Sequence, residues 1–327
     1  MSVPLMLAFA LAFVMSWGLI RLLMPLFLAY ALARPNGRSS HKVPVPQGGG
    51  AGVILGTLLA GLPVASMAGM SPPANEALAL LALLMGILGA WDDIRPLGWR
   101  FRLASQALII GALLFLLPEN LQVLPFLPLV VERALALVLG LWFVNLTNFM
   151  DGIDGLLVIG LAPMAAAIGL GFFGLVPPEP VAMAFCGALL GFLMMNRPPA
   201  RIFAGDLGAL SIGLIAAYLL FLVASRTSLA AAILLPLYFV GDATVTLLLR
   251  ALKGETLTVA HRRHAYQSAF DAGMPITRIL GEVLGLNIVL AGLAAATLVW
   301  PNIAGGLLVM GLVLTGLLLW RLRHWKG

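Results

Sequence analysis

The chain has 327 residues, of which 61% are hydrophobic and only 10% are charged. Soluble domains contain roughly 45–50% apolar and 25% charged residues, so this composition excludes a soluble globular protein. The formal net charge of +6 does not indicate nucleic-acid binding, because the basic residues fall in short loops between long apolar blocks.

Those blocks approach the length of about 20 residues that a helix needs to cross a bilayer. They predict an all-α, polytopic membrane protein, a single transmembrane domain over residues 1–327. About eleven spans are expected, at 5–30, 48–69, 76–91, 103–117, 131–147, 155–174, 180–195, 208–223, 229–250, 278–299 and 303–320.

The distribution of lysine and arginine predicts the orientation. One set of loops is rich in basic residues, and the C-terminal tail adds Arg321, Arg323 and Lys326, whereas the opposite loops contain only Arg133 and Arg226. Basic loops stay in the cytoplasm, so we expect a protein of the bacterial inner membrane whose basic face is cytoplasmic. Six of the seven aspartates fall on this same face, which indicates a site there.

The first candidate motif closes the span 76–91 with Asp92 and Asp93, followed by Arg95. Adjacent carboxylates repel each other unless a cation compensates. One interpretation is a solvated helix end with Arg95 as the partner. The other is a Mg²⁺–phosphate site, because Mg²⁺ takes one or two carboxylates together with substrate phosphates.

The second motif contains Asn148, Asp151 and Asp154, with glycines at 152 and 155. Residues three apart stack on one side of a helical turn. The stretch has no lysine or arginine, and an unpaired charge at membrane depth costs roughly 2.5–3.5 kcal/mol, which argues against a purely structural role.

The third motif is Gly205, Asp206 and Gly208, which follows the basic segment ending at Arg201. Taken alone this pattern is a common turn, but it lies on the same face as the other aspartates. The seventh aspartate, Asp242, is expected about two turns inside the span 229–250, either as an indirect partner of the site or as a polar contact between helices.

The fourth motif is the loop segment His261, Arg262, Arg263, His264, which continues to Gln267. Guanidinium groups suit bidentate phosphate contacts, so we predict an anion site. The alternative is a basic segment that touches anionic lipid. An earlier basic loop, which includes His41 and leads to glycines 48–50, could also hold a phosphate head group.

Taken in order, these motifs resemble the polyprenyl-phosphate N-acetylhexosamine-1-phosphate transferases (glycosyltransferase family 4), and most closely the bacterial branch that primes O-antigen and related glycans. The resemblance covers most of the chain. Two positions depart from the family pattern: Pro96 stands where a third acid is common, and Gln47 where arginine is common.

The resemblance implies that a UDP-N-acetylamino sugar reacts with undecaprenyl phosphate to give undecaprenyl-diphosphate-sugar and UMP, and both direct attack and an aspartyl intermediate stay open. It implies Mg²⁺, which Mn²⁺ could replace, and catalytic roles for five aspartates. These are Asp92, Asp93, Asp151, Asp154 and Asp206, with Asp93, Asp206 and Asp154 as metal ligands. The implied substrate-binding residues are Asn148, His261, Arg262, Arg263, His264, Arg201 and His41.

Membrane lipids are the other expected partners, and small-residue helix faces could support a homodimer. Two rival functions fit an aspartate-rich membrane protein: an intramembrane prenyltransferase and an ion-coupled transporter or lipid flippase. The identity of the sugar is not predicted.

Overall fold

The computed structural model describes residues 2–33, 44–69, 74–256 and 261–326. Eight of its helices are long and apolar enough to cross a membrane, which agrees with the predicted polytopic all-α class. They are α1 (Val3–Tyr30), α2 (Gly50–Met67), α3 (Ala74–Ile94), α4 (Trp99–Leu116), α5 (Leu129–Met150), α9 (Gly205–Arg226), α13 (Ile276–Val299) and α14 (Ala304–Arg323), where the span that ends in α14 begins in the 3-10 turn Pro301–Ile303.

The remaining elements are shorter. Two apolar helices lie inside the bundle, α6 (Leu156–Gly169) and α8 (Pro180–Asn196). The others are α7 (Gly171–Gly174), α10 (Leu229–Leu234), α11 (Leu237–Leu252), α12 (Ala265–Asp271) and the two-stranded antiparallel ribbon of β1 (Leu32–Ala33) and β2 (Val45–Pro46).

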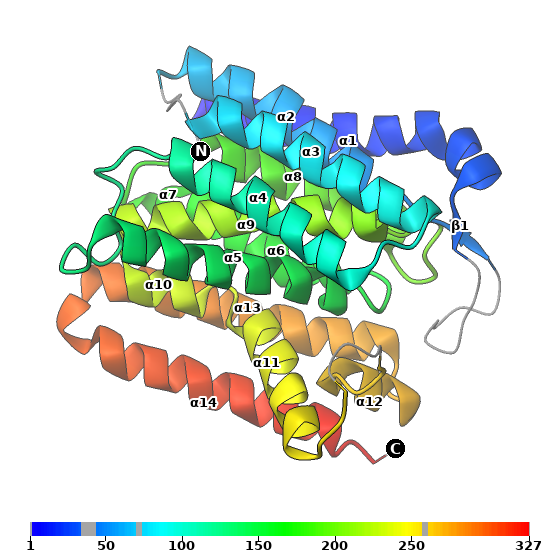
Figure 1. The fold of residues 1–327 in the computed structure, drawn as a ribbon. Helices are drawn as coiled ribbons and strands as arrows, with labels where there is room; N and C mark the ends of the chain where they lie inside the picture. The colour runs from blue at the N-terminus through cyan, green and yellow to red at the C-terminus, as the bar shows by residue number, and fades with distance from the viewer. Residues whose placement is uncertain (1, 34–43, 70–73, 257–260, 327) are drawn as a thin grey trace.

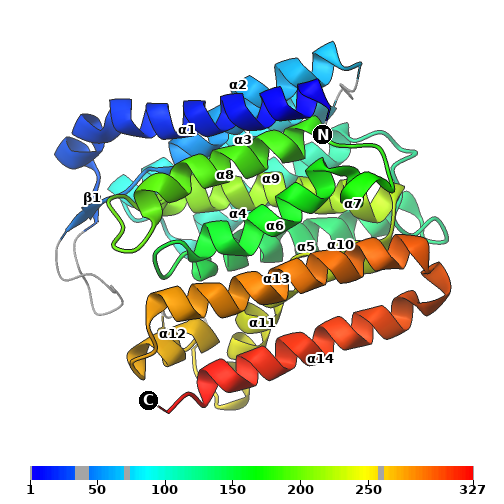
Figure 2. The same cartoon turned by 180° about the vertical axis from the view of Figure 1, so that it is seen from behind.

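The bundle has α1 and α2 on one side, α8 and α9 in the middle, and α13 and α14 on the other side (Figure 1, and from behind Figure 2). The strand β1, helix α12 and the C-terminus lie at one end of the bundle, and α7 lies at the opposite end. We therefore expect the predicted site residues to lie together at this end of the bundle.

The expected span 229–250 is wrong as a single helix. It breaks into α10 and α11 around Pro236, which caps the start of α11. Proline has no backbone N–H, so the helical hydrogen bond that residue 236 would donate is missing at this break. As a result α11 runs across the direction of the long helices toward α12 (Figure 1).

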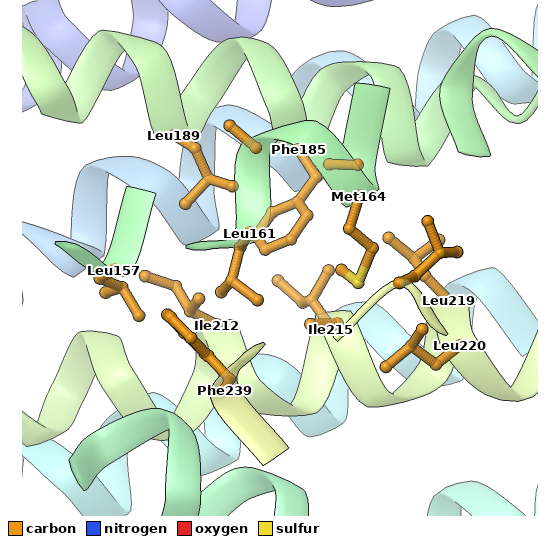
Figure 3. Close-up of a cluster of buried hydrophobic side chains, with 14 of the residues drawn as sticks. Leu157, Leu161, Met164, Phe185, Leu189, Ile212, Ile215, Leu219, Leu220 and Phe239 are labelled. Carbon is orange, nitrogen blue, oxygen red and sulfur yellow. The ribbon is translucent and has the colours of Figure 1, made fainter. Parts of the chain in front are cut away.

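The core lies where α6, α8, α9 and α11 meet. Figure 3 shows Leu161 and Met164 from α6 against Phe185 from α8 and Ile215 from α9, all of them buried. Phe239 of α11 packs into the same cluster. A closely packed apolar centre of this kind fixes the ends of these helices relative to one another, and the predicted site residues lie near those ends.

Candidate active site

The end of α3 holds the start of α9. The Asp93 carboxylate accepts hydrogen bonds from the backbone N–H groups of Asp206 and Leu207, both at 3.1 Å. The first N–H groups of a helix have no partner within the helix, so a carboxylate there stabilises it. Gly89 makes the approach possible, because a Cβ at that position would lie 2.3 Å from the Asp206 carbonyl oxygen.

Asp92 faces a different partner. Its carboxylate accepts hydrogen bonds from the Leu97 N–H at 2.6 Å and from Arg102 Nη1 at 2.9 Å. The same nitrogen lies 3.7 Å from Asp206 Oδ2, so one guanidinium bridges two aspartates. Arg102, and not Arg95, is therefore the basic partner of the pair. Arg102 was not among the predicted site residues, although it lies in the first turn of α4, close to the aspartate pair along the chain.

Asp92, Asp93 and Asp206 together form what we call the aspartate cluster. The second motif contacts this cluster through Asn148, near the end of α5, which donates a hydrogen bond from Nδ2 to Asp206 Oδ1 at 2.6 Å. Asp154 is placed differently from the others. It is 3% exposed and accepts a hydrogen bond from the Ala200 N–H at 2.9 Å, which ties the start of α6 to the loop before α9. In the sequence Asp151 lies between Asn148 and Asp154, at the end of α5. No residue that the structure describes donates a hydrogen bond to its carboxylate.

Negative charge accumulates around Asp151. Burial raises the pKa of the Asp151 carboxyl well above its usual range, and the nearby carboxylates of Asp206, Asp154 and Asp93 raise it further. Within the described ranges, no three Asp, Glu, His or Cys side chains are arranged as a ready-made ion site. A Mg²⁺ ion that is held by one or two carboxylates and by substrate phosphates fits this arrangement, because Mg²⁺ prefers hard oxygen ligands and several carboxylates lie close together here.

The raised pKa of Asp151 predicts a pH-dependent stability in the presence of a chelator. A carboxyl whose pKa is higher in the folded state contributes stability that is fully present below the unfolded pKa of 3.8 and is lost as pH rises through the folded pKa. We therefore expect the melting temperature in EDTA to fall as pH rises above the unfolded pKa of 3.8. The decrease should be smaller in Mg²⁺ and smaller in Asp151→Asn. Equal slopes for the variant and the parent protein would contradict this assignment.

The histidine segment contacts the aspartate cluster through α12. The Tyr266 hydroxyl donates a hydrogen bond to the Phe149 carbonyl oxygen at 2.9 Å, directly beside Asn148. The rings of His261 and His264 lie 4.9 Å apart, and His264 lies 6.3 Å from the Phe149 ring. Burial, with the neighbouring cationic groups, lowers the pKa of His261 to about 4, so this imidazole is neutral near pH 7.

The two arginines of the segment are paired with acids. Arg262 donates to Asp271 at 2.8 Å, and Arg263 forms an ion pair with Glu255. A guanidinium carries five N–H donors, so an arginine is able to bind a carboxylate and an anion at the same time. The first pair joins the segment to the end of α12, and the second joins it to the stretch that follows α11.

The structure thus brings together Asp92, Asp93, Asp206, Asn148 and Asp151 at one end of the bundle, with His264 beside Phe149. Arg201 is exposed on the loop that Asp154 anchors. The predicted substrate-binding residue His41 lies outside the described residues. Arg102 and Tyr266 also contact the site, although neither was among the predicted site residues.

Comparison with known proteins gives one family. A family profile described as "Glycosyl transferase family 4" matches residues 76–224, which contain the first three motifs. The phospho-N-acetylmuramoyl-pentapeptide-transferase of Desulforudis audaxviator is 33% identical over 248 residues, which cover 64% of this chain and 74% of that protein.

A second relative is the phospho-N-acetylmuramoyl-pentapeptide-transferase of Deinococcus radiodurans, 31% identical over 237 residues that cover 63% of this chain and 72% of the relative. A third is a Bacillus subtilis protein named "Probable undecaprenyl-phosphate N-acetylglucosaminyl 1-phosphate transferase". It is 27% identical over 266 residues, which cover 75% of this chain and 71% of that protein.

Proposed function

This chain belongs to glycosyl transferase family 4, the polyprenyl-phosphate sugar-1-phosphate transferases, and from that premise we propose that it transfers an N-acetylamino-sugar-1-phosphate from a UDP-sugar to undecaprenyl phosphate. The observation that carries the proposal is the meeting of Asp93, Asp206 and Asn148 at one end of a bundle of membrane helices. Family membership also favours a transferase over the prenyltransferase and transporter alternatives.

The location suits the two substrates. The UDP-sugar is soluble, whereas undecaprenyl phosphate has its tail in the bilayer and its phosphate at the depth of the head groups. The aspartates lie where helix ends leave the apolar region, and the basic loops at this end of the bundle favour a cytoplasmic location for the site. We infer a protein of the bacterial inner membrane whose active site faces the cytoplasm.

In the proposed reaction an oxygen of the acceptor phosphate forms a bond to the β-phosphorus of the UDP-sugar. The bond from that phosphorus to the bridging oxygen breaks, and UMP leaves with both electrons. Several anionic groups approach each other, so the site has to screen them. Arg102, which already bridges Asp92 and Asp206, presents N–H donors at this point.

The other residues hold the substrates. Asp92, at the end of α3, is placed to orient the acceptor phosphate, and Asn148 holds Asp206 and the nucleotide end of the donor. The neutral His261 and its neighbour His264 bind the donor's diphosphate or sugar by hydrogen bonds.

Mg²⁺, or Mn²⁺ in its place, would be held by Asp206 and Asp93, with Asp154 and Asp151 next to them, and would neutralise phosphate charge that develops during transfer. Asp93 can serve in this way while it binds the start of α9, because each carboxylate oxygen has two lone pairs. Asp154 already binds Ala200 and is the least exposed of the three predicted ligands.

Assay of UMP release tests the function. The purified protein is incubated with undecaprenyl phosphate, Mg²⁺ and a panel of UDP-N-acetylamino sugars. The panel includes UDP-N-acetylmuramoyl-pentapeptide, because two of the compared relatives carry the pentapeptide-transferase name. We expect UMP and lipid-linked sugar with one donor and none in EDTA.

O-antigen priming predicts that the accepted donor is a simple N-acetylamino sugar. Turnover of the muramoyl-pentapeptide donor alone would replace that assignment while it keeps the reaction class. Prenyl transfer, or no turnover of any donor by folded protein, would contradict the proposed function.

A further inference from the structure

A buried aspartate outside the cluster is bonded to the histidine segment. Asp242, on α11, is fully buried. A buried carboxylate is costly unless it is paired and hydrogen-bonded, and removal of one partner leaves an uncompensated group. The partners of Asp242 therefore indicate what it supports.

Its first partners are backbone N–H groups at the start of α12. The carboxylate accepts a hydrogen bond from the Ala265 N–H at 2.8 Å and from the Tyr266 N–H at 3.4 Å. His264 Nδ1 lies 3.6 Å from the same carboxylate. One side chain of α11 thus fixes the backbone of the histidine segment and faces its second imidazole.

The anchoring of α12 by Asp242 also affects the aspartate cluster. Once its backbone is held by Asp242, Tyr266 directs its hydroxyl to the Phe149 carbonyl oxygen, beside Asn148. His264 lies against the Phe149 ring and against His261. The placement of both histidines relative to Asn148 therefore depends on one carboxylate that lies outside the cluster.

The last helix completes this arrangement. Arg323 of α14 has its Nη2 atom 3.7 Å from Asp242 Oδ1 and donates a hydrogen bond to Thr246 Oγ1 at 2.5 Å. Thr246 in turn donates to Asp242 Oδ1 at 3.1 Å. The guanidinium compensates the buried charge, so the end of the chain supports the histidine segment although α14 is far from the cluster in sequence.

We propose that Asp242 is a positioning residue that sets the histidine segment for the donor substrate, with Arg323 as its counter-charge. This inference rests on the proposed function, in which His261 and His264 bind the donor. It also decides between the two roles that the sequence left open for Asp242, because one carboxylate serves both as a contact between helices and as a support of the site.

Steady-state kinetics and hydrogen exchange test the proposal on the full-length protein. In Asp242→Ala we expect KM for the UDP-sugar to rise about tenfold, because a buried N–H group loses its acceptor, while KM for undecaprenyl phosphate changes less than about twofold. Backbone exchange in residues 261–272 should become faster. Arg323→Ala should give the same pattern with a KM increase of about threefold, and it keeps the proposal testable if Asp242→Ala does not fold.

Glu282→Gln is the matched control. Glu282 pairs with Arg321 of α14 at 2.9 Å and with Arg278 of its own helix at 3.2 Å, so its replacement removes partly exposed ion pairs and leaves the contacts of Arg323 with Asp242 and Thr246 in place. We expect neither KM nor exchange in residues 261–272 to change. If the control matches Asp242→Ala, or if both KM values rise together, the positioning role is wrong.

The two measurements separate this proposal from the proposed function. Unchanged exchange in Asp242→Ala would overturn the anchoring of the segment even in an active enzyme. Faster exchange with an unchanged donor KM would overturn its role in donor binding. Failure of the parent protein to use any donor would instead overturn the proposed function, and the exchange comparison would still report on the anchoring.

Discussion

Replacement of Asp206 by alanine is expected to lower the rate of UMP release by at least about a thousandfold in protein that stays folded. Asp206 is the point at which three elements meet: its backbone N–H binds Asp93, its carboxylate accepts from Asn148, and Arg102 lies 3.7 Å away. Loss of this carboxylate removes a proposed Mg²⁺ ligand and the group that Asn148 orients.

The measurement is single-turnover UMP release at saturating donor and Mg²⁺, together with the melting temperature. Glu119→Gln is the control, because it also removes one negative charge but lies exposed in the loop between α4 and α5. Turnover of Asp206→Ala within about tenfold of the parent protein would contradict the placement of this residue at the reacting phosphates.

Replacement of Gly152 by alanine is expected to lower activity by about ten- to a hundredfold, because a 1 Å displacement of a substrate-positioning group can cost this much. A Cβ at position 152 would lie 2.0 Å from the Tyr266 hydroxyl oxygen. Tyr266 is fully buried and cannot move away without breaking its hydrogen bond to Phe149. The alanine variant should therefore push the histidine segment away from the end of α5.

Tyr266→Phe tests the same contact, because it removes the oxygen that would clash with the new Cβ at position 152. We expect a loss of less than about tenfold for Tyr266→Phe alone, since one net hydrogen bond contributes about 1 kcal/mol. The double variant should be more active than Gly152→Ala, and this coupling can be measured in a double-mutant cycle. Additive losses in the cycle would show that the contact between Gly152 and Tyr266 does not link the two motifs.

The helix predictions succeeded where the sequence has long apolar runs, because such a run can cross a bilayer only as a helix that satisfies its own backbone hydrogen bonds. The ends of α1, α5 and α9 fall within a few residues of the expected spans. The span 229–250 failed because a proline in the sequence does not by itself show whether the helix breaks: Pro25 and Pro163 lie inside helices, whereas Pro236 separates α10 from α11. The count of eleven spans stays a prediction, since α6 and α8 are shorter than the eight long helices.

The sequence by itself determined that this is a polytopic membrane protein with its acidic and histidine motifs at one face, because hydropathy, loop charge and residue type are properties of the local chain. Only the tertiary structure decided which carboxylate faces which partner. Asp93 binds the start of α9, Asp154 anchors the loop at Ala200, Asp242 supports the histidine segment, and Arg102 bridges Asp92 to Asp206. These contacts join residues that are distant in the chain, and they depend on how closely the helices pack, as at Gly89, where α3 meets α9 only because there is no side chain.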